Sequence, residues 1–283
     1  MAENIPQGCS TDECGTKPAC SGCSHNTHTQ EQPKKPAPRV RKVIGVVSGK
    51  GGVGKSLIAG TLAVMLRRRG LKVGVLDADI TGPSVPYMFG VHEKAYGDGE
   101  SIFPAVTESG IRLISVNLML PNDEDPVVWR GPILASAVEQ FWQDVDWGEL
   151  DVMVIDMPPG TGDVPLTVYQ TIPLDGVIIV TTPQDLVGMI VRKAINMASM
   201  MKIPVLGLVE NMSYALCPDC GKHIEIFGKS HTAEEAMKQG IPLLAQLPFN
   251  PQCAALCDQG KIEDIQINEL DAAAGYLAGI VNS

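Results

Sequence analysis

The chain has 283 residues and a formal net charge of −10 at pH 7. This length fits one large α/β domain plus a tail, or two small domains. The acidic balance gives no support to nucleic-acid binding, which needs a basic surface against phosphates. No apolar run reaches the roughly 18 residues of a membrane span, and residues 1–10 lack the basic and apolar regions of a signal peptide. We therefore expect a cytoplasmic protein that binds neither nucleic acid nor membrane.

Residues 1–42 differ in composition from the rest of the chain. They include a Pro/Lys/Arg linker at residues 33–39 and show no helical or strand period, which predicts a flexible tail. Residues 43–283 form the expected folded domain. In a reducing compartment, eight cysteines indicate metal or redox chemistry rather than a disulfide framework.

Four cysteines lie in the tail with the spacing C-x4-C-x5-C-x2-C, namely Cys9, Cys14, Cys20 and Cys23. They are enough for one Cys₄ site, and the spacing does not choose between a [4Fe–4S] cluster and Zn²⁺. His25 and His28 follow closely and could serve in a zinc site. The alternative is a flexible tail with idle thiols.

A glycine-rich turn follows the apolar run at residues 43–48, which we interpret as a buried strand, and precedes a helical pattern. Strand, glycine-rich turn and helix are the context of a phosphate-binding loop, in which backbone N–H groups and the helix N-terminus face a polyphosphate. Lys55 would reach the β- and γ-phosphates, and the Ser56 hydroxyl would hold Mg²⁺. The alternative is a connection that binds nothing. The nucleotide-binding candidates are Gly49, Lys50, Gly51, Gly52, Val53, Gly54, Lys55 and Ser56.

Acidic residues follow two other predicted strands. Residues 71–76 deliver Asp77 and Asp79, and residues 151–155 deliver Asp156. Ligands bind outside the carboxyl ends of strands in open α/β sheets, so these acids should lie beside the phosphate loop. An apolar strand ending in Asp is the Walker B arrangement, whose carboxylate supports Mg²⁺. We therefore assign Ser56 and Asp156 to the magnesium site.

The remaining pattern alternates strands and helices. We expect strands at residues 176–181, 204–209 and 243–247, and a hairpin from residues 102–106 and 111–116. Helices are expected after residues 129–132, over about 186–201 and over about 268–280. Repeated strand–helix units predict an α/β fold with a doubly wound, mainly parallel sheet and helices on both faces.

A second chemical centre is Cys217-Pro-Asp-Cys220, a C-x-x-C knuckle that follows the strand at residues 204–209. One chain supplies two ligands here, whereas tetrahedral zinc or a [4Fe–4S] cluster needs four. A two-fold dimer could bring two such pairs together. The other interpretation is a dithiol redox motif.

These motifs together resemble two nested groups of proteins. Lys50, directly after the first glycine of the loop, resembles the signature lysine of the deviant Walker A class of P-loop ATPases. With residues 76–84, 156–163, 181–184 and 211–213 and the C-x-x-C pair, the chain resembles the Mrp/ApbC family over about residues 40–283. That family consists of nucleotide-dependent carriers or scaffolds for iron–sulfur clusters.

The resemblance implies roles for particular residues. Lys50 would reach across a dimer interface to the partner's nucleotide, and Asn211 would hydrogen-bond the adenine. Asp79 would orient or activate the attacking water, and Asp77 would join Ser56 and Asp156 at the magnesium site by supporting the metal and phosphate network. Pro248 would close the base pocket, and Arg130 would have an interface or switch role.

The implied protein is a homodimeric ATPase with a [4Fe–4S] cluster bridging Cys217 and Cys220 of both chains, delivered to apo-proteins. The tail resembles that of the cytosolic scaffold branch, which holds a second cluster. Alternatives are a positioning ATPase resembling MinD and a zinc-stapled targeting ATPase. We interpret Cys253 and Cys257 as buried or incidental.

Overall fold

The computed structural model describes residues 38–283 except for 80–81, 83, 100, 120–130 and 185–186. The tail cysteines, Arg130 and part of the first switch segment lie outside the described residues. Residues 36–283 form a single compact unit. In the part described, no helix is long and apolar enough to cross a membrane.

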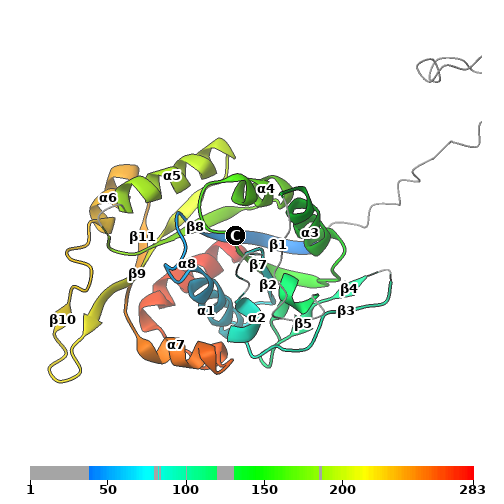
Figure 1. Ribbon diagram of the computed structural model, residues 1–283, viewed down its shortest axis with the longest axis horizontal. Coiled ribbons are helices and arrows are strands. Elements are labelled where there is room, and N and C mark those ends of the chain that lie inside the picture. The colour runs from blue at the N-terminus through cyan, green and yellow to red at the C-terminus, as the bar shows by residue number, and fades with distance from the viewer. Residues whose placement is uncertain (1–37, 80–81, 83, 100, 120–130, 185–186) are drawn as a thin grey trace, which may run out of the picture. The chain divides into compact units, whose positions relative to one another are not determined.

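The sheet at the centre of this unit is mainly parallel (Figure 1). In the described chain its order is β10-β9-β8-β1-β7-β2-β6-β5, and β11 pairs with β9 as well. The strands are β1 (Arg39–Ser48), β2 (Val73–Asp77), β5 (Ala105–Val106), β6 (Arg112–Ser115), β7 (Glu149–Asp156), β8 (Gly176–Thr181), β9 (Val205–Leu216), β10 (His223–Ile224) and β11 (Leu243–Pro248). A separate pair consists of β3 (Tyr96–Gly97) and β4 (Ile102–Phe103).

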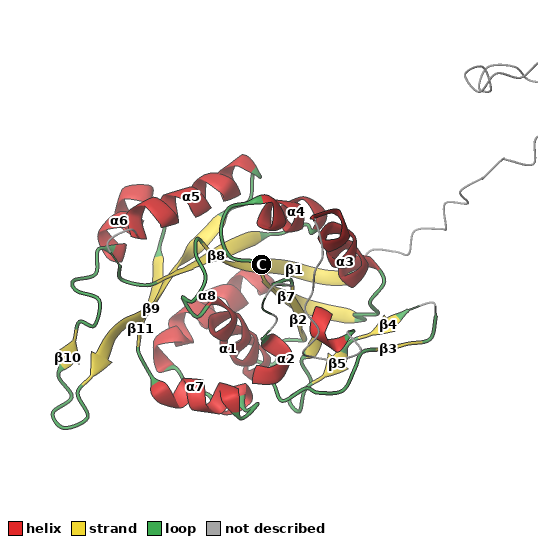
Figure 2. Ribbon diagram, viewed as in Figure 1, coloured by secondary structure: helices red, strands yellow, loops and turns green. Residues whose placement is uncertain are grey.

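Helices cover both faces of the sheet (Figure 2). One hydrophobic cluster joins the sheet to α1 (Lys55–Arg68), α2 (Val85–Met88), α7 (Pro251–Asp258) and α8 (Asp271–Asn282). The other joins it to α3 (Gly131–Gln143), α4 (Asp163–Thr171), α5 (Val187–Met200) and α6 (Thr232–Gln239). Short 3₁₀ turns are η1 (Val116–Leu118), η2 (Ile262–Asp264) and η3 (Asn268–Leu270).

The central strands explain this two-sided core. On β1, Ile44 and Val46 pack into the cluster of α1, whereas Val43 and Val47 pack into the opposite cluster. Successive side chains of a strand point to opposite faces, so a strand buried on both faces needs a nearly continuous apolar run. The predicted doubly wound fold is confirmed.

The first strand begins earlier than the sequence indicated. β1 starts at Arg39 rather than at residue 43, and it runs parallel to β7 from its first residue. Its basic side chains pair with acids of other segments: Arg39 with Glu149, Arg41 with Asp151 and Lys42 with Asp175. The segment has the composition of a linker, but it belongs to the sheet. Its acidic partners lie far along the chain, so the local sequence does not reveal the pairing.

Two other segments differ from the predictions. Only part of the expected hairpin forms: β5 pairs with β6, whereas Ile102 and Phe103 belong to β4 and pair with β3. β9 continues seven residues past the predicted end at residue 209, to Leu216, because β11 and β10 give it pairing partners along that length.

Candidate nucleotide and metal site

The turn between β1 and α1 has the shape of a phosphate-binding loop. β1 ends at Ser48 and α1 begins at Lys55, as the motif predicts. A side chain at Gly49 would overlap Ile190 of α5, and Gly54 has a φ of 80° and no room beside the Asn211 amide. Both positions therefore require glycine.

Lys55 and Ser56, at the start of α1, converge on the carboxylate that ends β7. Lys55 is 5 % exposed, and its Nζ lies 2.6 Å from Asp156 Oδ1 and 3.4 Å from Asp79 Oδ2. Ser56 Oγ donates a hydrogen bond of 2.5 Å to Asp156 Oδ2. The structure thus brings together the lysine, the hydroxyl and the two acids that the motifs singled out.

Asp77 lies beside Asp156 across the register of β2 and β7. It accepts hydrogen bonds from Asp79 N at 3.1 Å, Val85 N at 3.4 Å and Ser115 Oγ at 3.1 Å. Burial, with a further contribution from Asp156, raises the pKa of Asp77 well above its usual value. Burial also raises the pKa of Asp156, although Lys55 opposes that effect.

The donor set suits Mg²⁺. Hydroxyl and carboxylate oxygens are the hard ligands that Mg²⁺ takes in proteins, and Ser56, Asp77 and Asp156 supply them. Two adjacent buried carboxylates also favour a nearby cation, because like charges disfavour ionisation of both groups. The residues present therefore fit the metal assigned from the sequence.

Lys50 occupies the outer side of the loop. Its ammonium donates to the side-chain amide oxygen of Gln184, which follows β8. Gln184 is neutral, so it does not neutralise the positive charge of Lys50. The motif at residues 181–184 and the phosphate loop are therefore in direct contact.

Asn211 and Pro248, assigned to the base pocket by resemblance, line one cavity of about 290 Å³. Its other walls include Leu57 of α1 and Cys253 of α7. The volume is at the lower end of the range for small-molecule sites, roughly 300 Å³. Asn211 Nδ2 also donates to Val53 O in the phosphate loop at 2.9 Å. The cavity and the loop therefore share a residue.

The two cysteines of the C-x-x-C motif lie beyond the sheet. We call residues 214–229 the cysteine hairpin; it contains the end of β9, the knuckle and β10, and Figure 1 shows it projecting from the left of the domain. None of its residues is buried. Lys222 O accepts from Cys217 N, and Cys217 O accepts from Gly221 N, each at 2.9 Å. These bonds close the knuckle.

The knuckle also favours a thiolate. Hydrogen bonds from the backbone N–H groups of Cys220 and Asp219, and from the Cys220 thiol, lower the pKa of Cys217. Thiolate is the form that binds metal ions, and a lowered pKa makes more of it available at neutral pH. The partly exposed Cys217 and the exposed Cys220 supply sulfur ligands, which fit a soft metal or an iron–sulfur cluster.

Cys253 and Cys257 differ from this pair. Cys253 is buried on α7, and burial raises the pKa values of both thiols, to about 11 for Cys257. Among the described residues, no three His, Cys, Asp or Glu side chains gather in a way that could hold a metal ion. The cysteine hairpin thus offers two thiols, whereas a tetrahedral zinc or [4Fe–4S] site needs four ligands.

Sequence reasoning missed the residues that hold the base of this hairpin. Glu210 is wholly buried and accepts from Ser213 Oγ, Ser230 Oγ and Gln246 Nε2. A charged residue inside an apolar strand was a usable signal, because carboxylates are rarely buried without partners. The short helix α7, which walls the cavity, was also missed.

The sheet order, the glycine loop after β1 and the acid at the end of β7 define a P-loop NTPase. A family profile described as "ParA: NUBPL iron-transfer P-loop NTPase" matches residues 39–282. The chain belongs to this family, and the resemblance to Mrp/ApbC-type proteins is confirmed.

Two relatives with similar sequences share one name. The iron–sulfur cluster carrier protein of Clostridium perfringens is 45% identical over 261 residues, covering 89% of this chain and 91% of the relative. The protein of that name from Methanocaldococcus jannaschii is 43% identical over 252 residues, covering 88% and 87%.

Solved structures show the same fold. A nucleotide-binding protein from Archaeoglobus fulgidus in complex with ADP has a TM-score of 0.75 and 40% identity, covering 82% of this chain and 92% of its own. The cell division protein MinD of Aquifex aeolicus has a TM-score of 0.58 at 16% identity, covering 86% and 97%, which is a likeness of fold alone.

Proposed function

We propose that this protein is an ATP-dependent carrier that binds a [4Fe–4S] cluster between two copies of the chain and transfers it to apo-proteins. The observation that carries the proposal is that β9 joins both sites. Asn211 on this strand lines the cavity beside the phosphate loop, and Cys217 follows the strand directly. The names of the relatives support iron–sulfur cargo.

A second copy would complete the cysteine site. Cys217 and Cys220 provide two thiolates, and a [4Fe–4S] cluster is held by four. The same pair from a two-fold partner supplies the rest. Large apolar side chains near the knuckle are exposed, and a partner would cover them: Leu216, Ile224, Ile226 and Phe227.

The nucleotide site has roles for each predicted residue. The backbone of residues 49–54 and the Lys55 ammonium would bind the phosphates, and Ser56, Asp77 and Asp156 would hold Mg²⁺. In binding phosphate, Lys55 would leave its contact with Asp156. Asp79, which also contacts Lys55, would orient the attacking water. Asn211 and Pro248 would enclose the adenine base.

Lys50 would act at the interface between copies. Lys50 is partly exposed, and its ammonium contacts the neutral side chain of Gln184. Lys50 could therefore exchange Gln184 for a phosphate of the nucleotide in the second copy without breaking an ion pair with Gln184. An ammonium facing transferred phosphate charge stabilises the transition state of hydrolysis.

We further propose that the residues that precede β1 act as a separate tail, which is shorter than the 42 residues expected from the sequence because Arg39 already belongs to the sheet. Cys9, Cys14, Cys20 and Cys23 would hold a second [4Fe–4S] cluster, and the domain that begins with β1 would carry the ATPase activity and the shared cluster.

Anaerobic reconstitution with iron and sulfide, followed by transfer to an apo-enzyme that needs a [4Fe–4S] cluster, tests the function. We expect the apo-enzyme to regain activity, and the C217A/C220A variant to support no transfer from the hairpin site. A C257A variant is the matched control, because that thiol belongs to α7 and not to the cysteine hairpin. Zinc in place of iron and sulfide would refute the carrier function. So would equal transfer by the double variant when both proteins have the four tail cysteines replaced by serine.

A further inference from the structure

We propose that Glu210 is a positioning residue that couples the nucleotide loop to the cysteine hairpin. The inference rests on the proposed function, in which a nucleotide site and a cysteine site work together. It assigns the link between these two sites to one buried carboxylate. Glu210 lies on β9, directly before Asn211, which contacts the phosphate loop.

The hydrogen bonds of Glu210 come from three segments of the chain. Its Oε1 accepts from Ser213 Oγ at 3.2 Å, and its Oε2 accepts from Ser230 Oγ at 2.6 Å and from Gln246 Nε2 at 3.0 Å. The carboxylate is 0 % exposed, and these three donors are neutral. A buried carboxylate is costly unless hydrogen-bonded, so its partners are held firmly in place.

Two of these donors, Ser213 and Ser230, flank the cysteine hairpin. Ser213 is the residue before it and Ser230 is the residue after it. The 16 residues between them include no buried residue, so the hairpin has no core of its own. Its position relative to the sheet must therefore be fixed mainly at its base, where Glu210 binds both ends.

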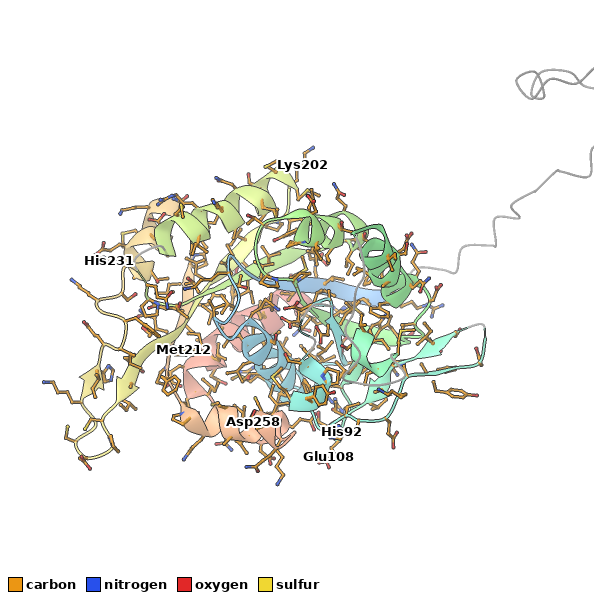
Figure 3. The ribbon with its side chains drawn as sticks, viewed as in Figure 1. His92, Glu108, Lys202, Met212, His231 and Asp258 are labelled. Carbon is orange, nitrogen blue, oxygen red and sulfur yellow. The ribbon has the colours of Figure 1, made fainter. Side chains whose placement is uncertain are left out.

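The backbone at this base is irregular. Glu210 lies opposite Gln246 on β11, and Tyr214 lies opposite Pro248, so β9 advances four residues while β11 advances two. Met212, labelled in Figure 3, has a φ of 55°. Such bulges redirect side chains and occur beside active sites. Here the bulge lets Ser213 return to the carboxylate of Glu210.

On the other side, the adjacent residue holds the nucleotide loop. Asn211 Nδ2 donates to Val53 O at 2.9 Å, and Asn211 Oδ1 accepts from Met212 N at 3.0 Å. Gly54 lies against the same amide. A ligand that moves Val53 or Asn211 therefore displaces the backbone next to Glu210, and through it both ends of the hairpin.

The test compares the alkylation rate of Cys217, followed by mass spectrometry of its peptide, with and without ATP in cluster-free full-length protein. We expect ATP to change the wild-type rate by about fivefold or more, the lower end of typical coupling between sites. In E210A the ATP effect should fall below about twofold, while ATP affinity stays within about threefold of wild type. S230A removes the hydrogen bond to Glu210 Oε2 and the one that Ser230 Oγ accepts from Thr232 N, and it should at least halve the effect.

E235A is the matched control. Glu235, on α6, is also a nearly buried carboxylate, but it accepts hydrogen bonds from Arg192 of α5 and Gln239 of α6. Because these partners lie outside β9 and the cysteine hairpin, E235A should leave the ATP effect intact. No ATP effect in wild type, a full effect in E210A or S230A, or lost ATP affinity in E210A would each overturn the proposal. If E210A does not fold, S230A decides.

These rates need no bound cluster. Coupling can therefore be found or refuted whatever the iron analysis says about the carrier function.

Discussion

The nucleotide end and the cysteine end of this protein are built in opposite ways. Lys55 and Asp156 are buried and hydrogen-bonded to each other, and the buried Asp77 lies beside Asp156, so one chain brings together the side chains proposed to bind phosphate and Mg²⁺. Cys217 and Cys220 lie in an exposed segment with backbone hydrogen bonds but no buried residue. A site that is complete in one chain can bind a ligand alone, whereas a site with two ligands needs a partner.

The largest effect is expected at the buried end. K55A should abolish ATP hydrolysis and lower the free energy of unfolding by about 3–5 kcal/mol, because it leaves the buried Asp156 without its cation. Denaturant unfolding and phosphate release measure the two effects. Normal stability in K55A would contradict the buried ion pair.

K50A sharpens the contrast within the same loop. Lys50 contacts Gln184 at the surface, so stability should stay within about 0.5 kcal/mol of wild type. Hydrolysis should nevertheless fall by about 100-fold, since one oriented donor to the transition state is worth that much. Unchanged turnover at saturating ATP would show that Lys50 does not stabilise the transition state of ATP hydrolysis.

The exposed end should show loss of cargo without loss of fold. C217A/C220A should bind no cluster at the hairpin, while its thermal midpoint stays within about 2 °C of the wild-type value, because neither side chain is buried. Iron analysis and calorimetry, with the tail cysteines replaced by serine in both proteins, give the two readouts. A large drop in the midpoint would show that the knuckle stabilises the fold.

Thiol reactivity separates the cysteines by their surroundings. The lowered pKa of Cys217 gives it more thiolate at pH 7 than an ordinary cysteine, so its alkylation should level off at a lower pH. Cys257, with a pKa of about 11, should react slowly at pH 7 and accelerate throughout the rise toward pH 11. Peptide-resolved labelling between pH 6 and 11 checks this order, and equal profiles would contradict it.

The smallest effect concerns the surface around the knuckle. I226E places a charge on an exposed apolar residue of the cysteine hairpin and should weaken the association of two loaded chains about tenfold, without altering monomer stability. I133E, on α3, is the control for adding a charge at an exposed isoleucine. Light scattering across a dilution series measures both; equal weakening would contradict an interface at the hairpin.

The difference between the ends also shows what the sequence can predict. The phosphate loop and the acids after β2 and β7 follow from local patterns, because strand ends and glycine turns are specified by adjacent residues. Arg39 was assigned to a linker, since its strand pairing depends on Glu149 far along the chain. Glu210 was missed for the same reason, as Ser230 and Gln246 reach it only in the folded protein.

The most direct test of the shared-cluster account is the composition and mass of the reconstituted protein with its four tail cysteines replaced by serine. We predict about four iron and four sulfide per two chains, in a particle with the mass of a dimer, and none in the C217A/C220A version. A full cluster in a particle with the mass of one chain, or a cluster retained without the two cysteines, would contradict the account.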